Sequence, residues 1–274
     1  ACGRLVMATD AHVVSPLFFP GGDIGSLAVH GTLNDVAMLG ARPSYLAAAF
    51  ILEEGFPLAD LTRIAASMGR AARAAGVPVV TADTKVVERG KADGVFITTT
   101  GVGVLMDGVE ISGSNARPGD AVLVSGPIGD HGMAIMSVRE NLSFAAPIES
   151  DSAALHGLIA DLLAAVPHLH VLRDPTRGGV AATLNEIAQQ SGVGIVLDEA
   201  AIPVRPAVAA ACELLGLDPL NIANEGRVLV FCPAADAARA LATLQAHPLG
   251  REAALIGEVS VDPRPFVHTR TPSR

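Results

Sequence analysis

Hydrophobic residues recur at two spacings along the chain, which predicts a mixture of helices and strands. From Leu58 to Ala75 apolar residues return every three or four positions, as expected of a helix that buries one face. Residues 44–52 form a nearly continuous apolar run, long enough for a buried strand, and residues 94–105 are rich in β-branched side chains. The same patterns predict further strands over 4–9, 77–82, 121–125, 194–197 and 227–232, and helices within 20–38 and over 131–140, 153–166, 180–190, 206–215 and 234–246.

A polar stretch divides the chain into two halves. Residues 107–120 are rich in Gly, Asn and Pro, a composition typical of a boundary between folded units. We therefore expect an N-terminal domain over 1–106, a C-terminal domain over 117–263, and the start of a tail over 264–274. Strands and helices do not alternate regularly in either half, so an α+β (mixed α/β) fold is favoured over a doubly wound sheet.

Composition and charge narrow the class of protein. Of the 274 residues 50% are hydrophobic but only 3% are aromatic, so the core must consist mainly of Ala, Val, Leu and Ile. A net charge of -9 argues against non-specific binding to nucleic acid, which requires a basic surface. No apolar run approaches the roughly 20 residues that cross a bilayer, and no signal segment opens the chain. We expect a cytoplasmic protein that binds neither membrane nor nucleic acid.

Cysteines and histidines provide no evident metal site or hydrolase triad. Cys2, Cys212 and Cys232 lack paired ligand spacing and are expected to be buried free thiols in a reduced compartment. The eight histidines are scattered, and there is no Gly-x-Ser-x-Gly elbow.

Short polar clusters stand where predicted strands or turns end. In the first half they are Thr9-Asp10, Asn34-Asp35 and the segment Thr-Ala-Asp-Thr-Lys over 81–85. Carboxylates supply the hard oxygen ligands that Mg²⁺ prefers, and a lysine supplies a point charge to a phosphate. A helix cap or a turn is the ordinary explanation for any one aspartate. Their joint occurrence points to a phosphate and its metal.

The second half carries three further clusters. Residues 125–132 follow a predicted strand and open a helix, where backbone N–H groups can bind an anion, although the P-loop ending is absent and an ordinary turn is equally compatible. Residues 174–179 combine a carboxylate, an arginine and two glycines before a helix. Asn224-Glu225-Gly226 adds a carboxylate that could shuttle a proton or could simply form a turn.

In this order the clusters resemble the HypE family of the aminoimidazole ribonucleotide (AIR) synthetase superfamily. The resemblance covers almost the whole chain and lies in the segments 7–14, 18–25, 34–37, 83–87, 174–179 and 224–226. Phe-Phe-Pro-Gly-Gly-Asp-Ile-Gly over 18–25 and Asp-Thr-Lys-Val-Val over 83–87 are fairly specific to HypE. The Asn-Asp and Gly-Gly elements also occur in relatives that make selenophosphate, thiamine diphosphate or purines.

The resemblance implies a fold and an activity. Its N-terminal domain would form a β-barrel across a homodimer, with ATP in clefts beside it, and its C-terminal domain would be α/β. Members of the family carry a carbamoyl group on a C-terminal cysteine and use ATP to dehydrate it to a thiocyanate, which supplies cyanide to the iron of [NiFe]-hydrogenase. The implied partners are a HypF-like carbamoyltransferase and the HypC–HypD complex.

The resemblance also implies roles for individual residues. Lys85 and Glu225 would be the catalytic pair that removes the amide protons after O-phosphorylation. The implied Mg²⁺ ligands are Asp10, Asp35, Asp83 and Asp174. The implied ATP-binding residues are Asn34, Thr84, Gly129, Asp130, His131, Gly132, Arg177 and Gly178.

Two departures from the family keep alternatives open. The family begins with a further Gly-rich segment and ends in Pro-Arg-Ile-Cys, whereas this sequence ends in Thr-Pro-Ser-Arg over 271–274. We expect a trimmed sequence that binds nucleotide but lacks the thiol required for turnover. The alternatives are another ATP-using member, such as a selenophosphate synthetase, or a tailless, non-catalytic scaffold in hydrogenase maturation.

Overall fold

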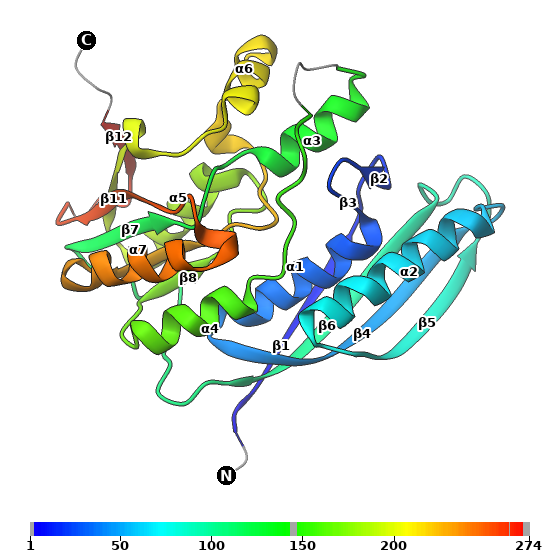
Figure 1. Ribbon diagram of the computed structural model, residues 1–274, viewed down its shortest axis with the longest axis horizontal. Helices are drawn as coiled ribbons and strands as arrows, with labels where there is room; N and C mark the ends of the chain where they lie inside the picture. The colour runs from blue at the N-terminus through cyan, green and yellow to red at the C-terminus, as the bar shows by residue number, and fades with distance from the viewer. Residues whose placement is uncertain (1–2, 143–146, 263, 271–274) are drawn as a thin grey trace.

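The N-terminal half forms a four-stranded sheet in the order β1-β6-β4-β5 (Figure 1). The computed structural model describes residues 3–142, 147–262 and 264–270. The strands are β1 (Leu5–His12), β4 (Ala41–Glu53), β5 (Val79–Val87) and β6 (Val95–Leu105), and β2 (Phe18–Phe19) and β3 (Gly22–Asp23) form a separate hairpin. β6 pairs antiparallel with β1 and β4, while β5 runs parallel to β4 at one edge.

Two helices cover one face of this sheet. Helix α1 (Ile24–Met38) packs against the strands, and α2 (Leu58–Ala75) lies beside it (Figure 1). The amphipathic pattern predicted α2 with its observed bounds, and the helix ends at Gly76, whose φ of 68° suits a residue without a side chain. Asp23 caps α1, because its carboxylate accepts hydrogen bonds from the N–H groups of Gly25 (2.8 Å) and Ser26 (3.0 Å).

The C-terminal half forms a six-stranded sheet in the order β12-β9-β11-β7-β10-β8. Its strands are β7 (Asp120–Val124), β8 (Val171–Arg173), β9 (Gly194–Asp198), β10 (Leu229–Pro233), β11 (Ala254–Ser260) and β12 (Val267–Arg270). Its helices are α3 (Asp130–Arg139), α4 (His156–Ala165), α5 (Gly179–Ser191), α6 (Pro206–Leu215) and α7 (Ala237–Ala246), with short 3₁₀ turns η1 (Glu199–Ala201), η2 (Pro219–Asn221), η3 (Ala234–Asp236) and η4 (Pro248–Gly250). This mixed content confirms the predicted α+β class.

Alternation along the central strands creates two separate cores. In β7, Leu123 faces the core shared with α4 and α7, while Val122 and Val124 face the core shared with α5. Helices α3 and α6 pack on each other in a smaller cluster at the side of the sheet.

Several predicted bounds differ from the structure. The prediction ended two strands too early: β1 continues through His12 and β5 through Val87, so the polar clusters at 9–10 and 81–85 lie inside strands. Asn34 and Asp35 lie inside α1, as the helix predicted within 20–38 implied. β8, β11 and β12 were not predicted, and β12 pairs with β9, so residues 267–270 belong to the sheet instead of a tail.

The two halves contact each other through the segment that follows α3. This segment returns to the N-terminal half and leads into α4, which lies alongside α1 (Figure 1). Ser150 N–H donates to Pro20 O (2.9 Å). The guanidinium of Arg139, at the end of α3, donates to Ser15 O through Nη2 (2.8 Å). A cleft remains between the halves on the side where β1 faces the C-terminal loops.

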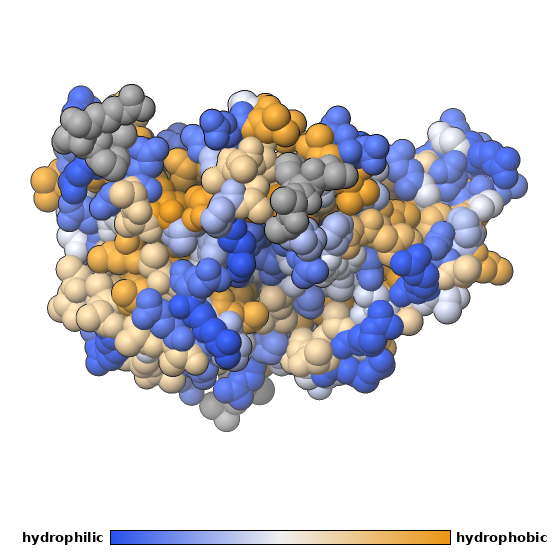
Figure 2. Space-filling model, turned by 45° about the horizontal axis from the view of Figure 1, so that its top comes forward, coloured by the Kyte–Doolittle hydropathy of each residue, from blue (hydrophilic) through white to orange (hydrophobic). Residues whose placement is uncertain are grey.

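The surface and the thiols agree with an ordinary folded protein. On the face seen in Figure 2, hydrophilic residues are interspersed among hydrophobic ones. Among the described residues, no helix is both long and apolar enough to cross a membrane. Cys212 and Cys232 are buried and free, and burial raises the pKa of the Cys232 thiol to about 12. Cys2 and residues 271–274 lie outside the described residues.

The cap of α1 provides a stability test. We expect Asp23→Ala to lower the free energy of unfolding by about 1 kcal/mol, because two N–H groups of the first turn lose their acceptor. Thermal denaturation measures this change. Asp236→Ala is the matched control, because Asp236 holds the same position at α7 without a side-chain capping bond. Equal losses for the two variants would contradict a specific role of the Asp23 cap.

Candidate functional site

The cleft between the halves has a volume of about 340 Å³ and gathers most of the predicted chemical residues. Strand β1 and helix α1 form one wall, and the start of α3 and the loops before α5 and before β10 form the other. Its titratable and charged lining residues are Asp10, His12, Asp35, His131, Asp174, Arg177 and Glu225. The fold thus brings together residues as far apart in sequence as Asp10 and Glu225.

The carboxylates in this cleft repel one another. Burial, followed by the charges of Asp174 and Asp10, raises the pKa of Asp35 to about 7. Burial also raises the pKa of Asp174. Burial, and then Asp174 and other nearby carboxylates, raises the pKa of Glu225 well above its usual range. A cation bound among these carboxylates would relieve their repulsion.

These oxygen donors suit Mg²⁺ by chemistry, but they do not form a finished metal cage. In the described part of the chain, no group of three or more His, Cys, Asp or Glu side chains is arranged to hold an ion. A metal here would need ligands from elsewhere, such as phosphate oxygens, which commonly complete the coordination of protein-bound Mg²⁺.

Arg177 reaches across the mouth of the cleft. Its Nη2 lies 3.5 Å from Asp10 Oδ1, so a loop of the C-terminal half meets a strand of the N-terminal half. The Arg177 side chain is 92% exposed, so this ion pair contributes little to stability. The guanidinium is free to bind an anionic ligand instead. Gly178, which follows it, also lines the cleft and starts α5 from a φ of 67°.

His12 is a cleft residue to which the sequence analysis gave no role. His12 Nε2 lies 3.1 Å from Thr99 Oγ1, a hydroxyl that also lies 3.1 Å from Ala28 O. Burial lowers the pKa of His12, which favours the neutral ring. The period of two along β1, which puts Asp10 and His12 on one face, was the available signal.

His131 also lines this cleft. Its Nδ1 is 2.8 Å from Ser150 Oγ, and its ring packs edge-to-face on Phe19 with centroids 5.5 Å apart. Burial lowers the pKa of His131 to about 4, so the ring is neutral near pH 7. It can therefore orient a polar ligand without adding charge.

Much of the backbone of the loop over 125–132, predicted to bind an anion, is engaged within the protein. Four of its backbone N–H groups already donate to protein acceptors: Ser125 to Val228 O, Ile128 to Pro203 O, Gly129 to Asn224 Oδ1 and Gly132 to Ala223 O. Gly129 and Gly132 are absent from the cleft lining. Asp130 lines a separate cavity of about 290 Å³, where its Oδ2 pairs with Arg205 (3.0 Å) and Arg227 (3.4 Å).

Asn34 is also engaged by the protein itself. Its Nδ2 donates to Ala153 O (3.0 Å) and Glu225 O (3.2 Å), and its Oδ1 accepts from Leu155 N–H (2.8 Å). The side chain is almost completely buried. Asn34 therefore bridges α1 and the C-terminal half, and its role in binding nucleotide stays a prediction.

Asp83, Thr84 and Lys85 lie outside the cleft of this chain. They stand on edge strand β5, where all three side chains are exposed. Lys85 Nζ is 2.9 Å from Asp83 Oδ2, and this contact lowers the pKa of Asp83. One copy of the chain therefore does not bring Lys85 to Glu225.

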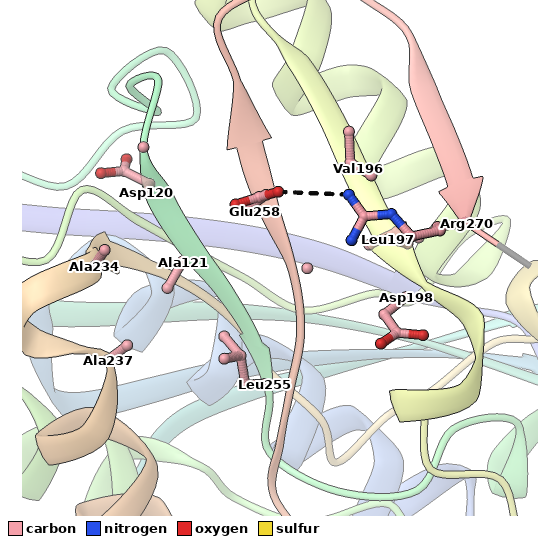
Figure 3. Close-up of a pocket in the computed structure, with 12 residues that line it drawn as sticks. Asp120, Ala121, Val196, Leu197, Asp198, Ala234, Ala237, Leu255, Glu258 and Arg270 are labelled. Atoms are coloured by element: carbon pink, nitrogen blue, oxygen red, sulfur yellow. Dashed lines mark ion pairs between the residues drawn. The ribbon is translucent and has the colours of Figure 1, made fainter. Parts of the chain in front are cut away.

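A further hollow lies on the outer face of the C-terminal sheet (Figure 3). Glu258 on β11 points toward Arg270 on β12, with Oε1 and Nη2 3.7 Å apart. Asp120 accepts a hydrogen bond from Arg117 N–H (2.8 Å) and pairs with His170 (2.8 Å). Because these charged groups are already paired with one another, this hollow lacks the crowded, mutually repelling carboxylates of the interdomain cleft.

Comparisons with known proteins agree with the geometry. Residues 1–105 match the family "AIR synthase related protein, N-terminal domain", and residues 117–270 match the corresponding C-terminal domain family. The chain is 70% identical over 271 residues to carbamoyl dehydratase HypE of Cupriavidus necator, covering 99% of this chain and 77% of that protein.

Two solved structures share the fold. The hydrogenase maturation protein HypE in complex with ATP superimposes with a TM-score of 0.96 and 53% identity, covering 99% of this chain and 83% of that one. A HypE–HypF complex gives a TM-score of 0.95 and 53% identity, covering 98% of this chain and 87% of the matched chain.

The raised pKa of Asp35 predicts a dependence of stability on pH. Because the folded-state value of about 7 exceeds the ordinary 3.8, the folded chain binds this proton more tightly, and the stabilisation is lost as the pH rises through 7. Without added metal, we expect the melting temperature of Asp35→Asn to fall less between pH 5 and 8 than that of the unmodified chain. Asp60→Asn, at a partly exposed carboxylate on α2 outside the cleft, is the control and should keep the original slope. Parallel curves for all three proteins would contradict the argument.

Proposed function

This chain belongs to the HypE carbamoyl dehydratases within the AIR synthase related family, and we propose that it uses ATP to dehydrate a carbamoyl group on a C-terminal cysteine to a thiocyanate. The cyanide so formed would become a ligand of the iron in [NiFe]-hydrogenase. The observation that carries the proposal is the interdomain cleft, where crowded carboxylates face an exposed arginine. Identity of 70% to a dehydratase favours this activity over that of a selenophosphate synthetase.

The proposed reaction removes the elements of water in two stages. The carboxamide oxygen attacks the γ-phosphorus of ATP, and ADP leaves with the bridging oxygen. Two protons then leave the nitrogen, the carbon–oxygen bond breaks to release phosphate, and the carbon–nitrogen triple bond forms. Phosphoryl transfer of this kind depends on positioning and on charge neutralisation.

Asp10, Asp35 and Asp174 are the proposed ligands of Mg²⁺. They are hard oxygen donors, and they lie close enough to raise the pKa of Asp35. A divalent cation would relieve that repulsion and neutralise charge on the transferring phosphoryl group. Arg177 would bind phosphate oxygens in place of its weak contact with Asp10, and Gly178 and His131 would contact the nucleotide or substrate from the same wall.

Glu225 is the proposed base at the amide nitrogen. A carboxylate whose pKa is raised is a stronger proton acceptor when ionised, and desolvation at the half-buried position of Glu225 supplies most of that rise. Its proposed partner, Lys85, requires a second copy of the chain, because it stands on exposed β5. We propose that two copies place Lys85 of one beside Glu225 of the other, and that Asp83 and Thr84 accompany it.

The N-terminal sheet supports such a homodimer. β5 is an edge strand and presents Val80 and Val86 to solvent, while Leu5 and Met7 are exposed on β1. An unpaired edge beside apolar side chains favours pairing with another sheet. A shared β-barrel would bury these groups.

The proposed partners supply the carbamoyl group and accept the cyanide. A HypF-like carbamoyltransferase would be the donor, and the solved HypE–HypF complex supports this assignment. The HypC–HypD complex would be the acceptor.

The full-length gene product, incubated with HypF, carbamoyl phosphate and ATP, should gain one carbamoyl group and then lose one water in intact mass spectrometry. Absence of any adduct would contradict the proposed activity.

The split of the catalytic pair between two copies predicts complementation. Lys85→Ala and Glu225→Gln should each abolish most turnover. When the two variants are co-expressed in equal amounts, about half of the dimers contain one copy of each, and such a dimer has one intact site and one doubly altered site. About one quarter of all sites should therefore be active. Lys91→Ala, at the other lysine of the chain, is the control and should keep normal turnover. No recovery in purified mixed dimers would exclude the shared site.

A further inference from the structure

The backbone of Glu225 is held from both sides by residues outside its own loop. Its N–H donates to Asp151 Oδ1 (3.1 Å), and its carbonyl oxygen accepts from Asn34 Nδ2 (3.2 Å). Asp151 belongs to the segment leading into α4, and Asn34 belongs to α1. Two elements remote in sequence therefore meet at this one residue.

Asp151 lies beside a buried arginine. Its side chain has no exposed surface, and its Oδ2 lies 3.5 Å from Arg227 Nε. Arg227 also donates to Pro127 O (2.7 Å) and Gly226 O (3.1 Å) and pairs with Asp130 (3.4 Å). Removing one member of a buried charged group leaves the others uncompensated, so this arrangement resists displacement.

The contact between the two segments leaves no free space. A Cβ atom on Gly226 would lie 1.7 Å from Asp151 O, closer than atoms can approach. Residue 226 must therefore be glycine for residues 225–227 to lie against residue 151. The neighbouring Asp151 carboxylate is then within reach of the Glu225 N–H.

We propose that Asp151 and Asn34 are positioning residues, which hold the Glu225 main chain so that its carboxylate meets the substrate nitrogen. This inference rests on the proposed role of Glu225 as the base. Neither side chain lines the reactive cleft, so each acts through Glu225 and does not touch the substrate. A displacement of about 1 Å in a reacting group can lower a rate by about 100-fold.

Kinetics of the full-length, carbamoylated protein test the proposal. We expect Asp151→Ala to lower kcat for dehydration by about 10- to 100-fold while changing the KM for ATP less than about twofold. Asp151→Asn keeps the acceptor oxygen and should recover most of the lost turnover. Asp161→Ala, on the exposed face of α4, is the matched control and should behave as the unmodified protein.

A double-variant cycle separates positioning from a general loss of structure. In a Glu225→Asp background, where the shortened carboxylate no longer reaches its native position, Asp151→Ala or Asn34→Ala should cause little further loss. Fully additive losses, or a loss confined to the KM for ATP, would overturn the proposal. If Asp151→Ala does not fold, Asn34→Ala in the same cycle decides the outcome. Full turnover by Glu225→Gln would instead refute the base role itself.

Discussion

The buried amide of Asn34 joins the two halves of the molecule, and the geometry of the cleft depends on it. From the middle of α1 it satisfies groups on the segment leading into α4 and on the loop carrying Glu225. A buried amide that makes all these bonds is costly to displace, because each lost partner would leave a polar group without solvent. The wall formed by β1 and α1 is therefore held in register with the C-terminal loops.

Once the halves are joined, the cleft concentrates negative charge that it cannot neutralise alone. Asp35, Asp174 and Glu225 lie half-buried near one another, and desolvation together with mutual repulsion raises their pKa values. This arrangement costs stability in the free chain and favours binding of a cation with its phosphate ligand. The same low-polarity surroundings that disfavour the charges strengthen their interaction with a bound ion.

The edge of the N-terminal sheet carries the lysine that is the proposed partner of Glu225. Lys85 lies on β5, which has a β4 partner on one side and solvent on the other. Polar side chains are tolerated on such a strand because nothing in the same copy packs against them. In the proposed pair, Glu225 lies in the cleft and Lys85 lies on this edge. A single copy would therefore hold only part of the site, and the proposed activity would require a dimer.

The sequence by itself determined α2 to its end residues, the mixed fold class and membership of the family, because periodicity and the order of motifs are local signals. It also assigned Asp10, Asp35, Asp174, Arg177 and Glu225 to one chemistry, and the cleft contains all five. Tertiary structure alone decided which motif residues keep their polar groups free for a ligand. The N–H of Gly129 and the side-chain amide of Asn34 form hydrogen bonds with residues about 95 or more positions away in sequence. Lys85 is exposed on β5, outside the cleft. Such partners come from other elements of the fold, so no local pattern could reveal them.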